Sequence, residues 1–249
     1  MLTITPFGRL GNNIAQILKC LCYSLSFDDP LKINFTLMKK EQPNIFNLLP
    51  DTLFENNSIE RVDSFWNEWT FWESNFNKAA EILMNLMDYS IQSNIDFNNS
   101  LIIHFRGGDS MDFLNWKHPP YYFYKNIIDN SNYKNIILVI EDYKNPVINK
   151  LLSNYNHCYA VSNSVSEDFK IIMNAIHFVD SQSSFSSSAL CLNKNIKTLY
   201  TTPQMHHYRK NYNNSNVINY NLEQYHNKPF NNFDEYHSFL LLDKDPFKE

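Results

Sequence analysis

The sequence predicts an α/β fold with parallel sheets, built as one large domain or as two lobes. Apolar runs of strand length alternate with amphipathic helical segments, an order that is typical of βαβ units. Hydrophobic residues make up 43% of the chain and aromatic residues 15%, which is enough for a packed core. Glycine is scarce, and its four copies fall in two pairs, each after an apolar run. We therefore expect glycine where the backbone closely approaches another group or takes a positive φ.

The first 36 residues predict one complete βαβ unit. Residues 2–5 form a short apolar run that predicts a buried strand, and residues 31–36 predict the next strand. Between them, apolar side chains recur at intervals of three and four, the pattern of one helical stripe: Ile14, Ile17, Leu18, Leu21, Cys22 and Leu25. Two strands joined by such a helix are expected to pair in parallel.

The segment that follows has a less defined pattern. Trp66, Trp69 and Trp72 recur every three residues, beside two phenylalanines. These rings either pack in the core or line a sugar-binding cleft, and both interpretations stay open. A second helical pattern covers residues 79–86.

The second half of the chain predicts further strands and helices. Strands are predicted for residues 101–105, 136–140, 176–179 and 197–200, and helices for residues 185–192 and 234–242. Ser166 is predicted to cap another helix, whose first turn carries Glu167 and Asp168 where the helix dipole favours acids. Either Ser183 or Ser184 can cap the helix at 185–192.

Charge and hydropathy argue against two classes of protein. The formal net charge is −5, and no cluster of lysine or arginine stands out, so we expect no nucleic-acid partner. The sequence has no apolar run of about 18 residues and no secretory signal, so we expect no transmembrane segment and a cytoplasmic protein. In that compartment the four cysteines are expected to be buried free thiols: Cys20, Cys22, Cys158 and Cys191.

Two glycine-containing loops, FGRLGNN and HFRGGD, each carry an arginine at the end of a predicted strand. In HFRGGD, Arg106 follows a parallel strand, at the edge where open α/β sheets bind their ligands. Its guanidinium can fork across two phosphate oxygens, and Gly107 and Gly108 let the backbone pass close to a nucleotide. The alternative is a plain turn with a surface arginine. Together the two loops predict a site for one anionic ligand.

A third segment, DSQSSFSSSALCL, runs from a predicted strand through a hydroxyl-rich turn into a helix. Backbone N–H groups and serine hydroxyls meet at this helix start, which is an anion site unless the serines only cap the helix. Upstream, the carboxylate of Asp168 can accept both N1–H and N2–H of a guanine, or can simply answer the helix dipole.

In this order, the three segments resemble the motifs of the α-1,2-fucosyltransferases (glycosyltransferase family eleven), and of the wider superfamily with the α-1,6- and protein O-fucosyltransferases. The family strings GRLGNQ, HxRRGD and NSSFSWWAAWL stand here as GRLGNN, HFRGGD and DSQSSFSSSALCL. The resemblance covers roughly residues 3–35 and 100–203. It implies a GT-B-like fold of two Rossmann-like lobes with a ligand cleft between them. The expected lobes are an acceptor-side lobe at 1–98 and a nucleotide-sugar-binding lobe with a helical tail at 99–249.

The resemblance also implies roles for individual residues. Arg106 matches the arginine that holds the β-phosphate, and His104 and Asp168 match residues near the guanine. The helix start matches the phosphate-binding turn, with Ser183, Ser184, Phe185 and Ser186. The first loop matches a loop that faces the cleft, with Arg9, Gly11 and Asn12. Two positions depart from the family pattern: its second arginine is Gly107 here, and its tryptophan pair is Ser187-Ser188.

The activity that the resemblance implies is inverting transfer of fucose from GDP-fucose to a glycan hydroxyl, without a cofactor or an essential metal. Arg106 and Asp109 are the expected catalytic residues, and Asp142 and Glu141 are further candidates for the base that serves the acceptor. The expected partners are a nucleotide-sugar donor and a glycan acceptor. Two alternatives stay open, namely another nucleotide-sugar on the same fold and a non-catalytic homologue that binds a carbohydrate or a nucleotide.

Two groups of potential metal ligands are interpreted as structural. Asp243 and Asp245 form an Asp-x-Asp pair that follows a helical pattern near the C-terminus, and we expect a surface charge cluster there. His206 and His207 have no carboxylate or thiol at ligand spacing. The sequence therefore predicts no metal site.

Overall fold

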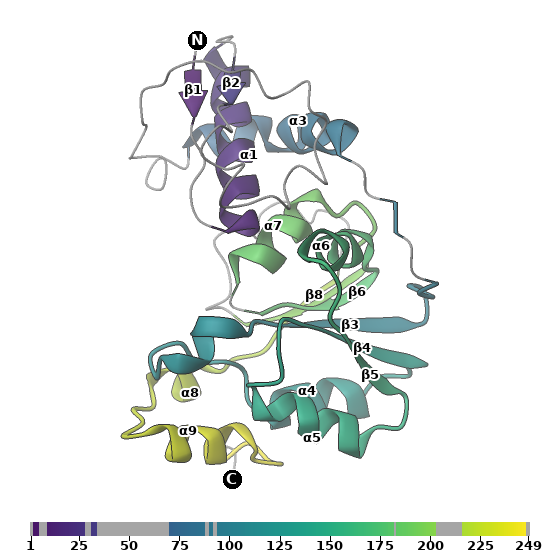
Figure 1. The fold of residues 1–249 in the computed structure, drawn as a ribbon, viewed down its shortest axis with the longest axis vertical. Coiled ribbons are helices and arrows are strands. Elements are labelled where there is room, and N and C mark those ends of the chain that lie inside the picture. The colour runs from purple at the N-terminus through teal and green to yellow at the C-terminus, as the bar shows by residue number, and fades with distance from the viewer. Residues whose placement is uncertain are drawn as a thin grey trace.

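A computed structural model of the chain describes residues 2–4, 9–27, 31–33, 70–87, 90–91, 94–181, 183–202 and 216–247. Its centre is a sheet of six parallel strands in the order β5-β4-β3-β6-β7-β8 (Figure 1). The strands are β3 (Ser100–Phe105), β4 (Asn135–Ile140), β5 (Cys158–Val161), β6 (His177–Val179), β7 (Thr198–Thr201) and β8 (Asn216–Asn219). The predicted α/β class with parallel strands is confirmed.

The strand order places a crevice at one defined point of this sheet. From β3 the chain first adds β4 and β5 on one side, and then returns to add β6, β7 and β8 on the other. This is the strand order of dinucleotide-binding folds, in which the ligand lies at the carboxyl ends of the strands where the direction reverses. Here those strands are β3 and β6, so the segments that follow them meet at one crevice.

Helices cover both faces of the sheet (Figure 1). One face carries α4 (Tyr121–Asp129), α5 (Pro146–Asn154), α8 (Glu223–Asn227) and α9 (Phe233–Leu240). The other face carries α6 (Val165–Asn174) and α7 (Ser184–Leu192), with α1 (Leu10–Phe27) and α3 (Thr70–Leu86) beyond them. A 3₁₀ turn, η3 (Gly108–Asp112), follows β3. None of the described helices is long and apolar enough to span a membrane.

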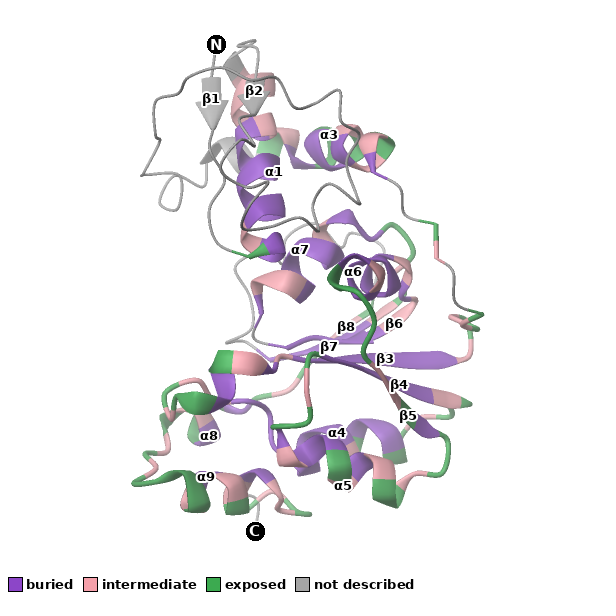
Figure 2. Cartoon of the chain, in the orientation of Figure 1, coloured by how far each residue is buried: buried purple, intermediate pink, exposed green. Residues whose placement is uncertain are grey.

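Residues of the strands alternate between two hydrophobic cores. In β3, Leu101 and Ile103 join the core beneath α4, α5 and α9, whereas Ile102 joins the core shared with α1, α3, α6 and α7. Figure 2 shows the buried residues running through the middle of the sheet and along the inner sides of these helices. Because the central strands are covered on both faces, they are nearly continuous apolar runs, which is why the sequence predicts them.

The predicted N-terminal βαβ unit is also confirmed. β1 (Leu2–Ile4) and β2 (Leu31–Ile33) pair in parallel, and α1 connects them. α1 packs against α3 and α7, so one hydrophobic core is continuous from the N-terminal helices to the central sheet. The division into lobes at residue 98 stays a prediction.

Several details differ from the prediction. Ser164, and not Ser166, caps α6: its hydroxyl accepts the N–H of Glu167 at 3.3 Å, and Ser166 is already the second helical residue. β5, β8, α4, α5 and α8 were not predicted; β5 and β8 lie at the two edges of the sheet and are partly exposed. Trp66 and Trp69 lie outside the described residues, as does the side chain of Trp72.

The four cysteines are free, as predicted. Cys20, Cys22 and Cys158 are buried, and Cys191 is half-buried. Burial raises the pKa of Cys20, Cys22 and Cys158 to about 12. These thiols therefore stay protonated at neutral pH, and they behave as small apolar side chains of the core.

Candidate functional site

A cavity of about 410 Å³ lies at the carboxyl end of the sheet. Residues from β3, from β4, from the loop between β5 and α6, and from the starts of α1, α6 and α7 line it. Its lining includes most of the residues predicted from the sequence: Arg9, Gly11, His104, Arg106, Asp168, Ser183, Ser184 and Phe185. The other lining residues are Leu10, Val139, Ile140, Glu141, Ser162, Asn163 and Val165. The structure thus brings segments that are far apart in sequence to the crevice that the strand order indicates.

Three other predicted residues do not line this cavity. Asn12 is half-buried in the first turn of α1. Asp109 lies beside Arg106 in η3, and its side chain is 56% exposed. Ser186 is fully buried in α7, where its hydroxyl donates to Oδ1 of Asp180 at 2.8 Å. The hydroxyl of Ser186 is therefore turned to the protein and not to a ligand.

Arg106, directly after β3, is a largely buried cation with few partners. Its guanidinium lies 4.1 Å from the ring centre of Trp116, and its Nη2 lies 3.6 Å from Oδ1 of Asp109. Its Nε is buried and has no hydrogen-bond partner among the described residues. Burial lowers the pKa of Arg106, and the nearby Asp109 carboxylate opposes this shift. A guanidinium with one long ion pair and an unused donor is well suited to receive an anion.

The start of α7 directs positive charge into the same cavity. Ser183 caps the helix, and its Oγ accepts the N–H of Phe185 at 3.1 Å. The other N–H groups of the first turn have no partner within a helix, and the helix dipole adds partial positive charge there. Phosphate and carboxylate groups are the ligands that such a helix start favours.

Gly11 brings the start of α1 to the same point. A Cβ at this position would lie 2.5 Å from Cα and from N of Phe185, so a larger residue does not fit. The hydroxyl of Ser188 donates to the carbonyl of Gly11 at 2.6 Å and ties the two helices together. The prediction that glycine marks a close approach is confirmed for Gly11, and the group approached is the backbone of α7. Two helix N-termini therefore meet at one cavity.

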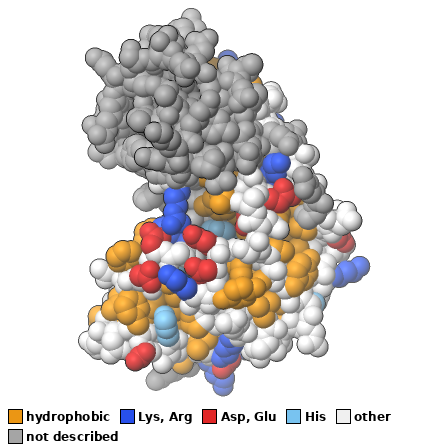
Figure 3. Space-filling view, in the orientation of Figure 1, with side chains coloured by type: hydrophobic (Ala, Val, Ile, Leu, Met, Phe, Trp, Pro, Cys, Tyr) orange, Lys and Arg blue, Asp and Glu red, His pale blue; other side chains and the backbone are white. Residues whose placement is uncertain are grey.

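Arg9 adds a second cation at the edge of the cavity. Its Nη1 donates to both carboxylate oxygens of Glu141, at 3.2 and 3.3 Å, and its Nη2 lies 3.8 Å from Asp109. Asp109 thus lies between Arg9 and Arg106. Figure 3 shows acidic and basic side chains gathered in one patch of the visible face. Exposed ion pairs are worth about 0–1 kcal/mol each, so a multivalent anion can replace these carboxylates as the partner of the arginines.

The two glycines after Arg106 fit against the end of β4. Gly108 has φ +63°, in the left-handed region, and its N–H donates to Oδ2 of Asp142 at 2.8 Å. A Cβ on Gly107 would lie 2.9 Å from Oδ1 of Asp142, and one on Gly108 would lie 2.9 Å from Oε1 of Glu141. Two carboxylate side chains therefore occupy the space beside Gly107 and Gly108.

Asp168 lines the part of the cavity next to β5 and is 8% exposed. Its Oδ1 accepts the backbone N–H of Asn163 at 3.2 Å and the side-chain amide of the same residue at 2.9 Å. Burial raises the pKa of Asp168, and these two hydrogen bonds oppose the shift. Asn163 thus fixes the carboxyl group through one oxygen, and Oδ2 has no donor among the described residues. That second oxygen can accept an N–H donor from a ligand.

His104 presents a neutral ring to the cavity. Burial, helped by the charge of Arg106, lowers the pKa of His104 to about 3. Its Nδ1 lies 2.5 Å from Oγ of Ser181, and its ring centre lies 5.4 Å from that of Phe185. At neutral pH the ring is therefore uncharged, and one of its nitrogens is already bound within the protein.

Sequence reasoning missed Trp116 and the loop between β5 and α6. Trp116 lies in a segment without periodicity, and only its contact with Arg106 reveals a role. Ser162 and Asn163 follow β5, the strand that was not predicted. Recognition of β5 would have indicated this loop, because ligands of such sheets lie at the carboxyl ends of the strands.

Metal ligands do not gather in the described part of the chain. No group of three or more His, Cys, Asp or Glu side chains that could hold a metal occurs among those residues. Asp243 pairs with Lys150 at 3.0 Å, as expected for a surface charge. His206 and His207 lie outside the described residues, and a metal-free site stays a prediction.

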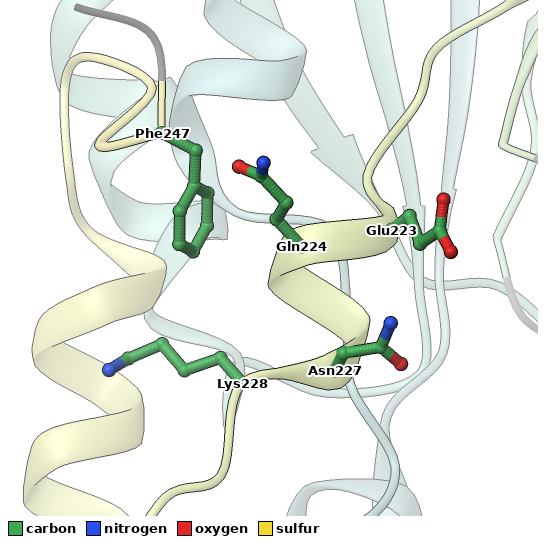
Figure 4. A pocket seen from close by; sticks show the side chains of 5 residues that line it. All are labelled: Glu223, Gln224, Asn227, Lys228 and Phe247. Carbon is green, nitrogen blue, oxygen red and sulfur yellow. The ribbon is translucent and has the colours of Figure 1, made fainter.

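A second hollow, of about 550 Å³, lies between α8 and the C-terminal residues (Figure 4). Glu223, Gln224, Asn227, Lys228 and Phe247 line it. Figure 4 shows the carboxylate of Glu223 and the ammonium of Lys228 directed to opposite sides, so these charges do not converge on one ligand group. No residue predicted from the motifs lies there. The cavity at the end of the central sheet is therefore the candidate site.

Comparisons with known proteins found similarity only among solved structures. No protein-family model matches the chain, and no curated protein sequence matches it. The α-1,6-fucosyltransferase NodZ co-crystallised with GDP matches with 12% identity and a TM-score of 0.46, over 76% of this chain and 91% of that chain. Fucosyltransferase NodZ from Bradyrhizobium matches with 9% identity and a TM-score of 0.43, over 76% and 91%. POFUT1 in complex with GDP-fucose matches with 11% identity and a TM-score of 0.45, over 80% and 96%. Similarity at this level assigns no ligand to this chain.

Proposed function

We propose that this chain is a glycosyltransferase that binds a GDP-sugar in the cavity at the carboxyl end of the central sheet. The observation that carries the proposal is the state of Arg106, a largely buried guanidinium whose Nε has no partner among the described residues. It shares its cavity with the start of α7. A diphosphate brings two negative charges and several acceptor oxygens, which satisfies both groups at once.

The order of the lining residues along the sheet suits the parts of a GDP-sugar. Asp168, on the β5 side, offers an acceptor for the N–H groups of the base. Arg106 and Ser184, at the point between β3 and β6 where the strand order reverses, suit the diphosphate. Fucose as the transferred sugar rests on the motif resemblance, as does the GT-B-like arrangement of lobes around the donor.

The proposed reaction is a single displacement with inversion. A hydroxyl oxygen of the acceptor attacks the anomeric carbon while the bond from that carbon to the β-phosphate oxygen breaks, and GDP leaves. Arg106 and the start of α7 stabilise the negative charge that grows on the leaving diphosphate. Asp109, which is 56% exposed beside Arg106, is the proposed acceptor of the hydroxyl proton. Because arginine and helix dipole meet the phosphate charge, no metal is required in this scheme.

The test is release of nucleoside diphosphate from a panel of nucleotide-sugars, measured with and without EDTA. We expect slow release of GDP from GDP-fucose or from a related GDP-sugar, and we expect this rate to survive EDTA. Loss of turnover with EDTA and its return with manganese would contradict the metal-free mechanism. A glycan array screened with the active donor then identifies the acceptor and the linkage.

A second candidate function is nucleotide or sugar binding without transfer. The observation that favours it is Gly107, because Glu141 and Asp142 crowd the place of the family's second arginine and one cation over the diphosphate is missing. Tight binding of GDP-fucose without any release of GDP, in the presence of the acceptor array, would support this second function and contradict the first.

A further inference from the structure

A chain of buried polar groups runs beneath His104. His104 Nδ1 lies 2.5 Å from Oγ of Ser181, which lies 3.3 Å from Oγ of Ser186, which donates to Oδ1 of Asp180 at 2.8 Å. The residues come from β3, from the turn after β6 and from α7, and each is at most 7% exposed. Only His104 lines the cavity. The motif resemblance implies a phosphate-binding role for Ser186, whereas its burial gives the hydroxyl a different set of partners.

The donor and acceptor roles in this series of buried groups can be assigned by starting at Asp180. Oδ1 of Asp180 already accepts the backbone N–H of Ser181 at 2.8 Å, so it acts as an acceptor toward Ser186. The hydroxyl of Ser186 also faces the carbonyls of Ser181 and Ser183, at 3.4 and 3.1 Å. All of these neighbours are pure acceptors, so the single proton of Ser186 is committed to them.

The roles at Asp180 and Ser186 then bear on which groups donate at Ser181 and at the imidazole of His104. Since Ser186 has spent its proton, the contact of 3.3 Å between the hydroxyl oxygens of Ser181 and Ser186 can be a hydrogen bond only if Ser181 donates it. With the proton of Ser181 placed in this way, its oxygen offers only lone pairs to Nδ1 of His104, and Nδ1 carries the hydrogen of the ring. The second ring nitrogen, Nε2, is then an acceptor.

We propose that Ser181 and Ser186 are positioning residues that hold His104 as the Nδ1–H tautomer and so make Nε2 a hydrogen-bond acceptor toward the cavity. Nε2 has no partner among the described residues, and the ring lines the cavity. The ligand group that it recognises is an N–H donor, such as the exocyclic amine of a purine. This ligand assignment rests on the proposed function, whereas the tautomer does not. A ring that presented Nε2–H would instead repel an amine, so the buried serines select the base.

The tautomer is measured directly on the ligand-free protein by long-range ¹H–¹⁵N correlation of the histidine rings at pH 7. We expect the His104 signals of an Nδ1–H ring, with Nε2 unprotonated, and His104→Gln identifies those signals by their loss. Ser181→Ala should shift the ring toward the Nε2–H form or a mixture, and Ser186→Ala should do the same. The matched control is Ser187→Ala, because Ser187 is also buried in α7 but lies outside this chain of hydroxyls. An Nε2–H ring in the unmodified protein overturns the proposal whatever the variants do.

The effect on recognition is measured by calorimetric titration with GDP and with inosine diphosphate, which lacks the exocyclic amine. We expect Ser181→Ala to weaken GDP about tenfold, the equivalent of one hydrogen bond, and to change the affinity for inosine diphosphate less than twofold. Equal losses for both nucleotides would mean that Ser181 only supports the local structure, and would overturn the positioning role. If the unmodified protein binds neither nucleotide while the Nδ1–H tautomer is observed, the proposed function fails and the tautomer assignment stands.

Discussion

The environment of the Arg106 side chain is the main physical evidence for a ligand in the cavity. Its guanidinium lies over the ring of Trp116, its burial makes the unpaired Nε costly, and its one carboxylate partner is mostly exposed. Desolvated donors are expensive to leave unmet, and the guanidinium that carries this one belongs to a residue that lines the cavity. Trp116 has the role of holding the cation in place, and the sequence alone does not indicate this.

Removal of the Arg106 guanidinium should abolish most transfer while the protein stays folded. The leaving diphosphate gains charge in the transition state, and loss of one preorganised donor costs about 10²–10³ in kcat. Arg106→Lys should recover little activity, because an ammonium cannot fork across two oxygens or stack on Trp116 as a plane. Donor turnover and thermal midpoints of both variants check this. Parental turnover in Arg106→Ala would show that HFRGGD is only a turn.

Asp168 should set the affinity for the base. Its fixed carboxyl group offers Oδ2 to the cavity, and the loss of buried hydrogen bonds to a ligand costs about 1–3 kcal/mol. We expect Asp168→Ala to weaken GDP roughly ten- to hundredfold. Glu167→Gln removes the neighbouring charge in the same helical turn, and we expect parental affinity in that variant. If calorimetry gives both variants the same affinity for GDP, Asp168 does not contribute to binding of the base.

At the scale of elements, the contact between α1 and α7 joins the N-terminal helices to the site. Gly11 allows this contact, and the hydroxyl of Ser188 reinforces it. The approach places two helix N-termini and two arginines around one volume, which no single element provides. An anion bound there would touch both helices.

The substitution Gly11→Ala tests whether the close contact with α7 or the helix propensity of alanine has the larger effect on stability. In an ordinary helix, alanine in place of glycine is stabilising by about 1 kcal/mol. Here the added Cβ would lie 2.5 Å from the backbone of Phe185, so we expect destabilisation by about 1–3 kcal/mol instead. We also expect weaker GDP binding, because the two helix starts must separate. Urea unfolding that shows a gain in stability would contradict the close packing of α1 on α7.

The elements that the sequence predicts well are those whose signal is local. β3 and β4 are continuous apolar runs, and the loop after β3 carries its arginine and glycines within a few residues. β5 and β8 escape prediction because they lie at the edges of the sheet and carry few buried residues. Within the site, Ser186 shows what a sequence motif cannot predict. Neighbouring residues of a helix face different directions, so one position decides whether a serine hydroxyl faces the ligand or, as here, the protein interior. The pairing of Arg9 with Glu141 joins residues that no pattern in the sequence connects.

At the scale of the whole molecule, buried histidines should make stability depend on pH. Burial lowers the pKa of His104 to about 3 and that of His118 and His226 to about 4, whereas the unfolded value is about 6.5. Below that value the unfolded chain binds protons that the native protein does not. The unfolding free energy should therefore be highest above pH 7. Toward pH 5 it should fall, by up to about 1.4 kcal/mol per pH unit for each histidine.

Urea unfolding at pH 7, 6 and 5 checks this dependence. Asp168, whose pKa burial raises, acts in the opposite direction, because the native protein then binds a proton at a pH at which the unfolded chain has already lost it. His104→Gln should flatten the slope by the share of one histidine. Equal unfolding free energies at pH 7 and pH 5 would mean that these rings become protonated in the folded protein.

The proposed function requires that the cavity at the carboxyl ends of β3 and β6 binds a guanine nucleoside diphosphate. The most direct measurement is calorimetric titration of the unmodified protein with GDP, UDP and ADP in the presence of EDTA. We predict one site per chain and an affinity for GDP at least about tenfold higher than for UDP or ADP, because only guanine offers adjacent N1–H and N2–H donors that the two lone pairs of Asp168 Oδ2 can accept together. Equal affinity for the three nucleotides, or no binding of GDP, would contradict the claim.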